Sequence, residues 1–157
     1  MFETKDSGKR EEFTSGMVRD TQDDKPRYDL IDPVMERRVR DRVHIYQAED
    51  ALLRWLAGDG SGEEVICHLA MLDNDPDDFF ARWAALMARG AKKYGEENWR
   101  KADGEAELKR FKASAKRHFY QLKVGCIDED HGAAVAFNIA GAEMVTAKLR
   151  AAHGIPA

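Results

Sequence analysis

The stretch from Asp128 to Ala152 reads DEDHGAAVAFNIAGAEMVTAKLRAA. Its apolar side chains recur every three or four residues with no proline among them, which is the spacing of one face of an α-helix. That face consists of Ala134, Val135, Ile139, Ala142, Val145 and Leu149. The acids at its start favour a helix N-terminus, because carboxylates complement the positive end of the helix dipole. We therefore expect a long helix that begins within residues 128–130 and ends near Ala152.

The same spacing predicts further helices upstream. The first begins at Pro33, because proline suits the first helical position, and it ends at Gly58. The others are expected at about 63–72 with Ser61 as N-cap, from the acidic turn 73–78 to Tyr94, and at about 105–124, with residues 98–104 as a loop. Alternating β-branched runs are missing, so no sheet of consequence is expected. The predicted fold class is all-α, with about five helices in an antiparallel bundle and an extended N-terminal arm.

Length and composition limit the organisation and the class of partner. The 157 residues make one ordinary domain, which we divide into a disordered start (1–12), an extended arm (13–33) and a single helical domain (34–157). No apolar run is long enough to span a membrane, and no segment of signal-peptide type is present, so we expect a cytoplasmic protein. Cys67 and Cys126 are then reduced thiols. The net charge of −4 argues against binding long nucleic acid but allows a small anionic ligand.

Three polar residues interrupt the apolar stripes of the last two predicted helices. His131 lies two turns before Asn138 on the final helix, and His118 lies on the inward stripe of the preceding helix with Arg117 beside it. Burying such a group without a partner costs about 1–3 kcal/mol. If the two helices pack antiparallel, these groups face a shared groove. They are then either hydrogen-bonded core residues or the catalytic residues of a site.

The acidic turn Asp128-Glu129-Asp130 is the best metal candidate in the sequence. Magnesium takes carboxylate oxygens and keeps several waters, so one or two acids together with substrate phosphate suffice to hold it. The alternative is that these acids only cap the helix that follows.

The segment from Gly90 to Trp99 combines cations, aromatic rings and an amide. Lys92 and Lys93 are candidates to hold phosphate as point charges. Tyr94 and Trp99 are candidates to stack on a base, although Trp99 also suits the core, and Asn98 adds an amide. In the arm, Arg19 and Arg27 are a second possible source of phosphate contacts. A lone arm of this kind more often packs onto a neighbouring subunit or stays mobile.

Three blocks of residues stand in a recognisable order. They are TSGMVRDT (14–21) with KPRYDL (25–30), RGAKKYGxxNW (89–99), and SAxRH (114–118) with DEDH (128–131) and Asn138. Together they resemble a phage-associated family, the dATP/dGTP diphosphohydrolase N-terminal domain, which is linked to the MazG-like all-α nucleoside triphosphate pyrophosphohydrolases.

The resemblance implies a magnesium-dependent enzyme that hydrolyses a purine deoxynucleoside triphosphate, dGTP or dATP, to monophosphate and pyrophosphate. It also implies a homo-oligomer, a dimer or larger, and the host cytoplasm as its location. Under this hypothesis the acidic turn binds magnesium, and Lys92, Lys93 and Arg117 hold phosphates. His118, His131 and Asn138 then orient the water or the substrate.

The chain departs from MazG-like enzymes in its carboxylates. Those enzymes carry Glu-x-x-Glu and Glu-x-x-Asp pairs on their helices, whereas the predicted helices of this chain carry neither and have Arg117-His118 and Ala134-Val135 instead. Two other hypotheses therefore stay open. One is a non-catalytic module that sequesters a nucleotide. The other is a helical protein-interaction domain, for which the long charged first helix is the main support, although solvated faces explain that helix equally well.

Overall fold

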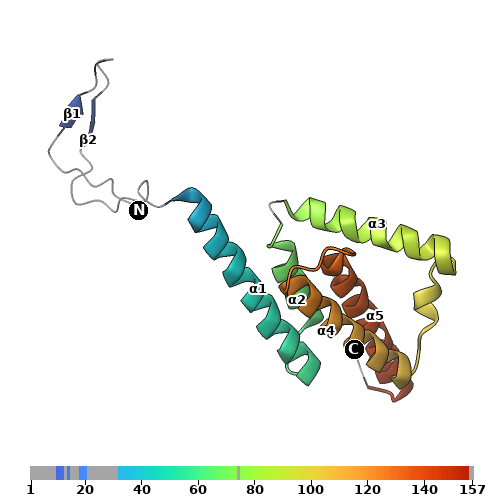
Figure 1. Ribbon diagram of the computed structural model, residues 1–157. Helices are drawn as coiled ribbons and strands as arrows, with labels where there is room; N and C mark the ends of the chain where they lie inside the picture. Colours follow the sequence, from blue (N-terminus) through green and yellow to red (C-terminus); the bar gives the residue numbers. More distant parts are fainter. Residues whose placement is uncertain (1–9, 13, 15–17, 21–31, 74, 156–157) are drawn as a thin grey trace. The chain divides into compact units, whose positions relative to one another are not determined.

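The structure, a computed structural model, describes residues 10–12, 14, 18–20, 32–73 and 75–155 (Figure 1). The chain divides into two compact units, residues 1–38 and 39–157, and each is described by itself. Arg27 lies outside the described residues, and so does the side chain of Arg19.

The first unit contains a short β-hairpin. Strand β1 (Arg10–Glu12) pairs with β2 (Val18–Asp20) in an antiparallel register that sets Arg10 opposite Asp20. Residues 10–12 are thus paired where a disordered start was expected, because a partner strand only a few residues away satisfies their backbone groups. Each strand has three residues, so the expectation of no substantial sheet holds for the described part of the chain.

Helices α1 (Pro33–Ala57), α2 (Gly62–Ala70) and α3 (Pro76–Tyr94) begin at side-chain caps. The Asp32 carboxylate accepts a hydrogen bond from the Met35 N–H at 2.8 Å, and the predicted cap Ser61 accepts one from Glu63 at 3.1 Å. Helix α3 ends as predicted at Gly95, whose φ of 92° favours glycine. Helix α2 ends at Ala70, two residues before the predicted Leu72.

The segment after α3 is not simply the loop expected at 98–104. It begins with a 3₁₀ helix, η2 (Asn98–Lys101). The Lys148 ammonium donates to the carbonyl oxygens of Arg100 at 2.5 Å and Ala102 at 2.9 Å. A cation from the last helix, α5 (His131–Ala152), therefore satisfies the carbonyls that η2 leaves open, and it ties this segment to that helix.

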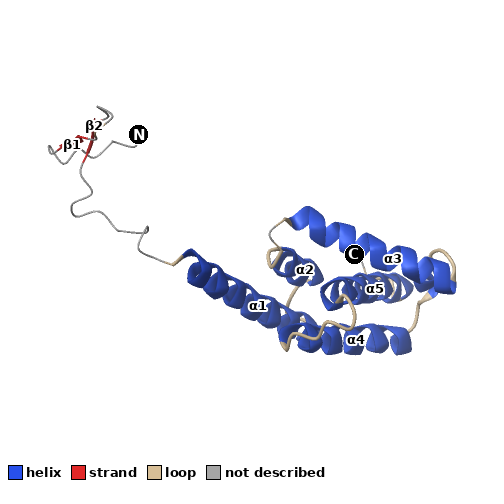
Figure 2. Cartoon of the chain, turned by 45° about the horizontal axis from the view of Figure 1, so that its top comes forward, coloured by secondary structure: helices blue, strands red, loops and turns tan. Residues whose placement is uncertain are grey.

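Helices α4 (Glu105–Lys123) and α5 (His131–Ala152) lie side by side and antiparallel (Figures 1 and 2). Helix α4 ends just before Gly125, as predicted, and the φ of 80° at this position favours glycine. The two helices approach closely at Gly141, where an added Cβ would lie 2.5 Å from the Phe111 ring. This packing supports the antiparallel arrangement predicted for the last two helices.

Helix α5 is the centre of the second unit. Within this unit α2, α3, α4 and η2 all contact it. Its predicted apolar face is buried except at Leu149, which is half-buried. The core around it consists of Ala48, Ala51, Leu52, Trp55, Val65, Leu69, Ala70, Phe79, Ala115, Phe119, Val135, Ala136, Ile139 and Ala142. The predicted all-α bundle is therefore confirmed, and within the described residues every helix is too short or too polar to span a lipid bilayer.

Candidate functional site

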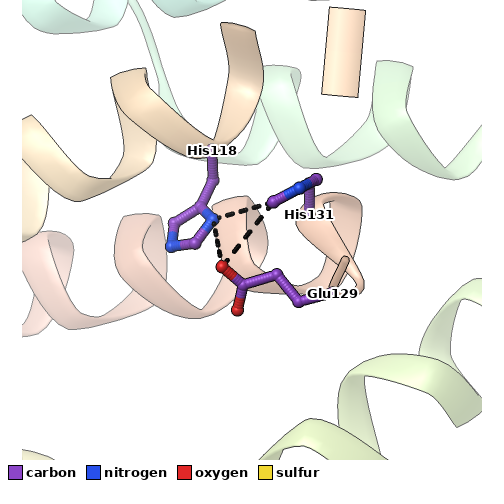
Figure 3. Close-up of side chains that lie close together, drawn as sticks. All are labelled: His118, Glu129 and His131. Carbon is purple, nitrogen blue, oxygen red and sulfur yellow. Dashed lines mark hydrogen bonds and ion pairs between the residues drawn. The ribbon is translucent and has the colours of Figure 1, made fainter. Parts of the chain in front are cut away.

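Two buried histidines lie next to each other at the connection between α4 and α5. His118 comes from the last turns of α4 and His131 is the first residue of α5, and they are 6% and 2% exposed. Their Nδ1 atoms lie 3.0 Å apart, with the Glu129 carboxylate beside both (Figure 3). We call His118, His131, Asp128 and Glu129 the histidine corner. The sequence predicted that these imidazoles face a shared groove; they do lie together, but neither is among the residues that line the groove described below.

A chain of hydrogen bonds runs through the corner and fixes the protons on both rings. Arg117 Nη2 lies 3.0 Å from His118 Nε2 and, since a guanidinium only donates, this nitrogen must accept. For a neutral ring the His118 proton is then on Nδ1, and it donates to His131 Nδ1. His131 in turn donates from Nε2 to Asp128 Oδ1 at 2.9 Å. The two imidazoles thus link a cation to a carboxylate.

The electrostatics of the corner agree with this assignment. Burial lowers the pKa of His118, and although the Glu129 carboxylate opposes this, the nearby Arg117 cation adds to the lowering. The hydrogen bond from His131 holds the pKa of Asp128 below its usual range. His118 is therefore neutral and Asp128 ionised near neutral pH.

The three acids of the turn point to different partners. Asp130 caps α5 through the Ala133 N–H at 3.0 Å, and both its oxygens lie 2.8 Å from Nη1 of Arg82 on α3. Asp128 accepts from His131, as described above. Glu129 Oε1 lies 3.5 Å from His118 Nδ1 and 3.9 Å from His131 Nδ1.

These contacts change the expected metal set. Two groups of described residues place ligand atoms close enough to share an ion, namely His118 with Glu129 and His131, and Cys126 with Asp128 and His131. Neither group contains more than one carboxylate of the acidic turn, and Asp130 belongs to neither. Asp130 lies apart from the other two carboxylates because it binds both the Ala133 N–H and the Arg82 guanidinium.

Asn138 does not join the histidines. Its side-chain N–H donates to the carbonyl of Ala134, one turn back on the same helix, at 2.8 Å. It is 7% exposed, so its burial is compensated by its own helix. Of the three residues expected to converge, His118 and His131 do and Asn138 does not.

A groove of about 960 Å³ lies beside the corner. The end of α3, the segment 95–100, Phe111 of α4, Phe137 of α5 and the acidic turn form its walls. Its polar and aromatic lining residues are Arg89, Lys93, Tyr94, Glu96, Glu97, Asn98, Trp99, Arg100, Phe111, Glu129, Asp130 and Phe137. Pockets for small ligands in proteins have this size.

The groove gathers most of the residues predicted to bind substrate. Lys93, Tyr94, Asn98 and Trp99 line it, whereas Lys92 and Arg117 are not among its lining residues. Lys92 is exposed, and because it is the residue next to Lys93 on α3, its side chain leaves the helix about 100° further around the axis. Arg117 instead contacts His118.

Two cations of the groove were not predicted as ligand-binding residues. Arg89 comes directly before the segment from Gly90 to Trp99, and Arg100 comes directly after it. Helical spacing offers a signal for Arg89, since it lies four residues before Lys93 on the same face of α3. For Arg100 no such signal exists, because the 3₁₀ turn that carries it was expected as a loop.

The aromatic wall is held together by edge-to-face contacts. The Trp99 ring lies 6.1 Å from Phe137, and Phe111 lies 6.0 Å from Phe137, both T-shaped. The Arg100 guanidinium lies 5.0 Å from the Trp99 ring centre. Trp99 is half-buried, and its contact with Phe137 makes it a wall of the groove.

Glu129 connects the corner and the groove. It belongs to the groove lining and also contacts both histidines, and its side chain is 52% exposed. The arrangement thus offers a carboxylate beside two buried imidazoles, in a groove that also contains three cations that suit an anionic ligand.

Comparison with curated proteins and with solved structures finds no significant match. Residues 55–151 match a protein-family model, and this range contains the blocks at 89–99 and 114–138 but not the block at 14–30. Because the match covers more than half of the chain, the chain belongs to the family described as dATP/dGTP diphosphohydrolase, N-terminal.

Proposed function

We propose that the groove binds a purine deoxynucleoside triphosphate, dGTP or dATP, and that the protein hydrolyses it to monophosphate and pyrophosphate. The family description supports the substrate and the reaction. The observation that carries the proposal for this chain is that one groove joins three cations, an aromatic wall and Glu129.

The cations suit the triphosphate. Arg89, Lys93 and Arg100 come from two elements, α3 and η2, and line the same groove. Arginine matches phosphate oxygens through two parallel hydrogen bonds and lysine acts as a point charge. Three such groups supply cationic contacts for a triphosphate, and Arg100 shares its charge with Glu97, which lies 3.4 Å away.

The aromatic residues suit the base. Tyr94 is exposed and Trp99 half-exposed at the groove, so each offers ring surface on which a purine can stack. Asn98 lies between them in sequence and can both donate to and accept from a base edge.

Magnesium fits this groove through one carboxylate. Proteins commonly hold it with one or two carboxylates, water and substrate phosphate, and Glu129 is the groove acid that lies outside the Arg82 ion pair and contacts the histidines. When bound, magnesium would stabilise charge on the departing pyrophosphate. In this proposal His118 and His131 are positioning residues, whose buried rings lie 3.5 and 3.9 Å from the Glu129 carboxylate oxygen at the groove.

The test is a hydrolysis screen over all ribo- and deoxynucleoside triphosphates with Mg²⁺, read by product chromatography. We expect dGMP or dAMP together with pyrophosphate, and at least a hundredfold lower kcat for Glu129→Gln. Glu105→Gln is the control, because Glu105 is an exposed acid of α4 that is not among the residues lining the groove, and it should keep full activity. Absence of turnover across the panel would contradict the proposal.

A second candidate is a nucleotide-binding module without turnover. It is favoured by one observation, that Asp128 and Asp130 are engaged by His131 and Arg82 and are less available for a catalytic ion. For this module a nucleotide should raise the melting temperature without forming product, because a ligand that binds the native state stabilises it.

A further inference from the structure

We propose that His118, His131 and Glu129 form a binding site for a first-row transition-metal ion of the zinc type. This site shares Glu129 with the magnesium arrangement above, but it adds two imidazole nitrogens and takes another class of ion. It rests on the three side chains alone and not on the proposed hydrolysis.

The geometry of the three donor atoms fits such an ion. His118 Nδ1, His131 Nδ1 and Glu129 Oε1 form a triangle with sides of 3.0, 3.5 and 3.9 Å (Figure 3). Zinc holds nitrogen and oxygen ligands at about 2.1 Å in a tetrahedron, which places the ligand atoms roughly 3.4 Å from one another. The triangle therefore matches one face of a tetrahedral site with little movement of the side chains.

The donor set selects the ion. Two imidazole nitrogens and one carboxylate oxygen suit zinc, cobalt, nickel or iron, whereas magnesium and calcium prefer oxygen throughout. A set of two histidines and one glutamate with a fourth position left open is also an arrangement found at catalytic zinc. Here Glu129 lines the groove, so the ion would lie beside it.

A neighbouring carboxylate prepares His131 for this role. Its Nε2–H donates to Asp128 Oδ1 at 2.9 Å, so the proton is on Nε2 and the lone pair of Nδ1 points at the triangle. Histidines that ligate a metal usually donate their other N–H to a carboxylate in this way. The His131 side chain is fully buried, which fixes the orientation further.

His118 needs a change of tautomer to bind the ion. Its proton is on Nδ1 while Nε2 accepts from Arg117. An ion on Nδ1 requires the proton to move to Nε2, with no net release, and Nε2 then stops accepting from Arg117. Arg117 is exposed and can turn into solvent. Arg117 therefore competes with the ion, and removing its guanidinium should strengthen metal binding.

The test is a titration of the chelator-stripped full chain with Co²⁺, without nucleotide, followed by visible absorption. We expect one Co²⁺ per chain with the intense bands of a tetrahedral site. Glu129→Gln should weaken binding at least tenfold, and Asp128→Asn about tenfold. Arg117→Met should strengthen it severalfold, and the groove control Glu96→Gln should leave it unchanged.

Two results would overturn the proposal. One is Co²⁺ binding that is absent or unaffected by Glu129→Gln, a substitution at a half-exposed side chain that leaves the fold intact. The other is a thiolate-to-cobalt absorption band that disappears in Cys126→Ser, since it would place the ion on Cys126, Asp128 and His131 instead. Neither result depends on nucleotide hydrolysis, so this proposal can fail while the proposed function stands.

Discussion

The two imidazoles of the histidine corner and the polar side chains of the groove lie in opposite environments. In the corner, the two imidazoles are buried and each ring nitrogen has a partner within 3.0 Å. In the groove, Lys93, Tyr94, Asn98 and Arg100 are exposed. Substitutions of the two buried histidines should therefore change stability and function together, whereas substitutions of the exposed groove residues should change ligand binding alone.

The largest effect is expected for His131→Ala. The change removes a fully buried ring, opens a cavity and leaves His118 and Asp128 without their partner. We expect the free energy of unfolding to fall by about 3 kcal/mol, as measured by urea denaturation. A variant as stable as the natural chain would show that the corner does not support the fold.

Lys93→Ala should have the opposite pattern. The Lys93 ammonium lies 4.9 Å from the centre of the neighbouring Tyr94 ring and is exposed at the groove, so unfolding should change by less than about 0.5 kcal/mol. Loss of one phosphate contact should weaken dGTP or dATP binding roughly tenfold, or about 1.4 kcal/mol. Calorimetric titration measures this, and Lys92→Ala, one residue away and outside the groove lining, is the control that should keep full affinity.

The comparison also shows what the sequence can reveal. Helix ends follow local rules, and Ser61 and Gly95 act as predicted. The apolar periodicity likewise predicts that His118, His131 and Asn138 are buried, and they are. These features depend on residues a few positions apart, which a single sequence contains.

The choice of partner for each polar group is not local. Asp130 binds Arg82, which lies 48 residues earlier, and this takes a carboxylate from the expected metal set. The Asn138 side chain donates to the Ala134 carbonyl on its own helix instead of to a group on another helix. Residue spacing alone does not distinguish these two possibilities. Arg100 enters the groove because Lys148 fixes η2 from 48 residues away.

A smaller effect tests how rigid the groove wall is. In Gly141→Ala the new methyl group would lie 2.5 Å from the Phe111 ring, which lines the groove. Overpacking outweighs the better helix propensity of alanine, so we expect a net loss of about 1 kcal/mol and weaker nucleotide binding.

Gly90→Ala is the matched control for this substitution. Gly90 lies within α3 and an added Cβ there meets nothing within 4 Å. It should stabilise the protein by about 0.5–1 kcal/mol. Equal effects of the two substitutions on the melting temperature would contradict the close approach of α4 and α5.

The smallest effect is a pH dependence confined to the corner. Burial lowers the pKa of His118 in the folded state, so the unfolded chain takes up a proton first as pH falls. His118 thus contributes stability that is complete above its unfolded pKa of about 6.5 and is lost as pH falls through the folded pKa. Protonation of His118 also places an N–H on Nε2, which then faces the Arg117 donor. The Glu129 and Asp128 carboxylates partly offset the new positive charge.

The measurement is the free energy of unfolding across this range, with a chelator present. His118→Gln should remove the decline that begins near pH 6.5 but keep the decline below about pH 3.9, because the lowered pKa of Asp128 acts only there. An unchanged slope near pH 6 in His118→Gln would mean that His118 is not the group that titrates, and that the corner is more open to water than its burial indicates.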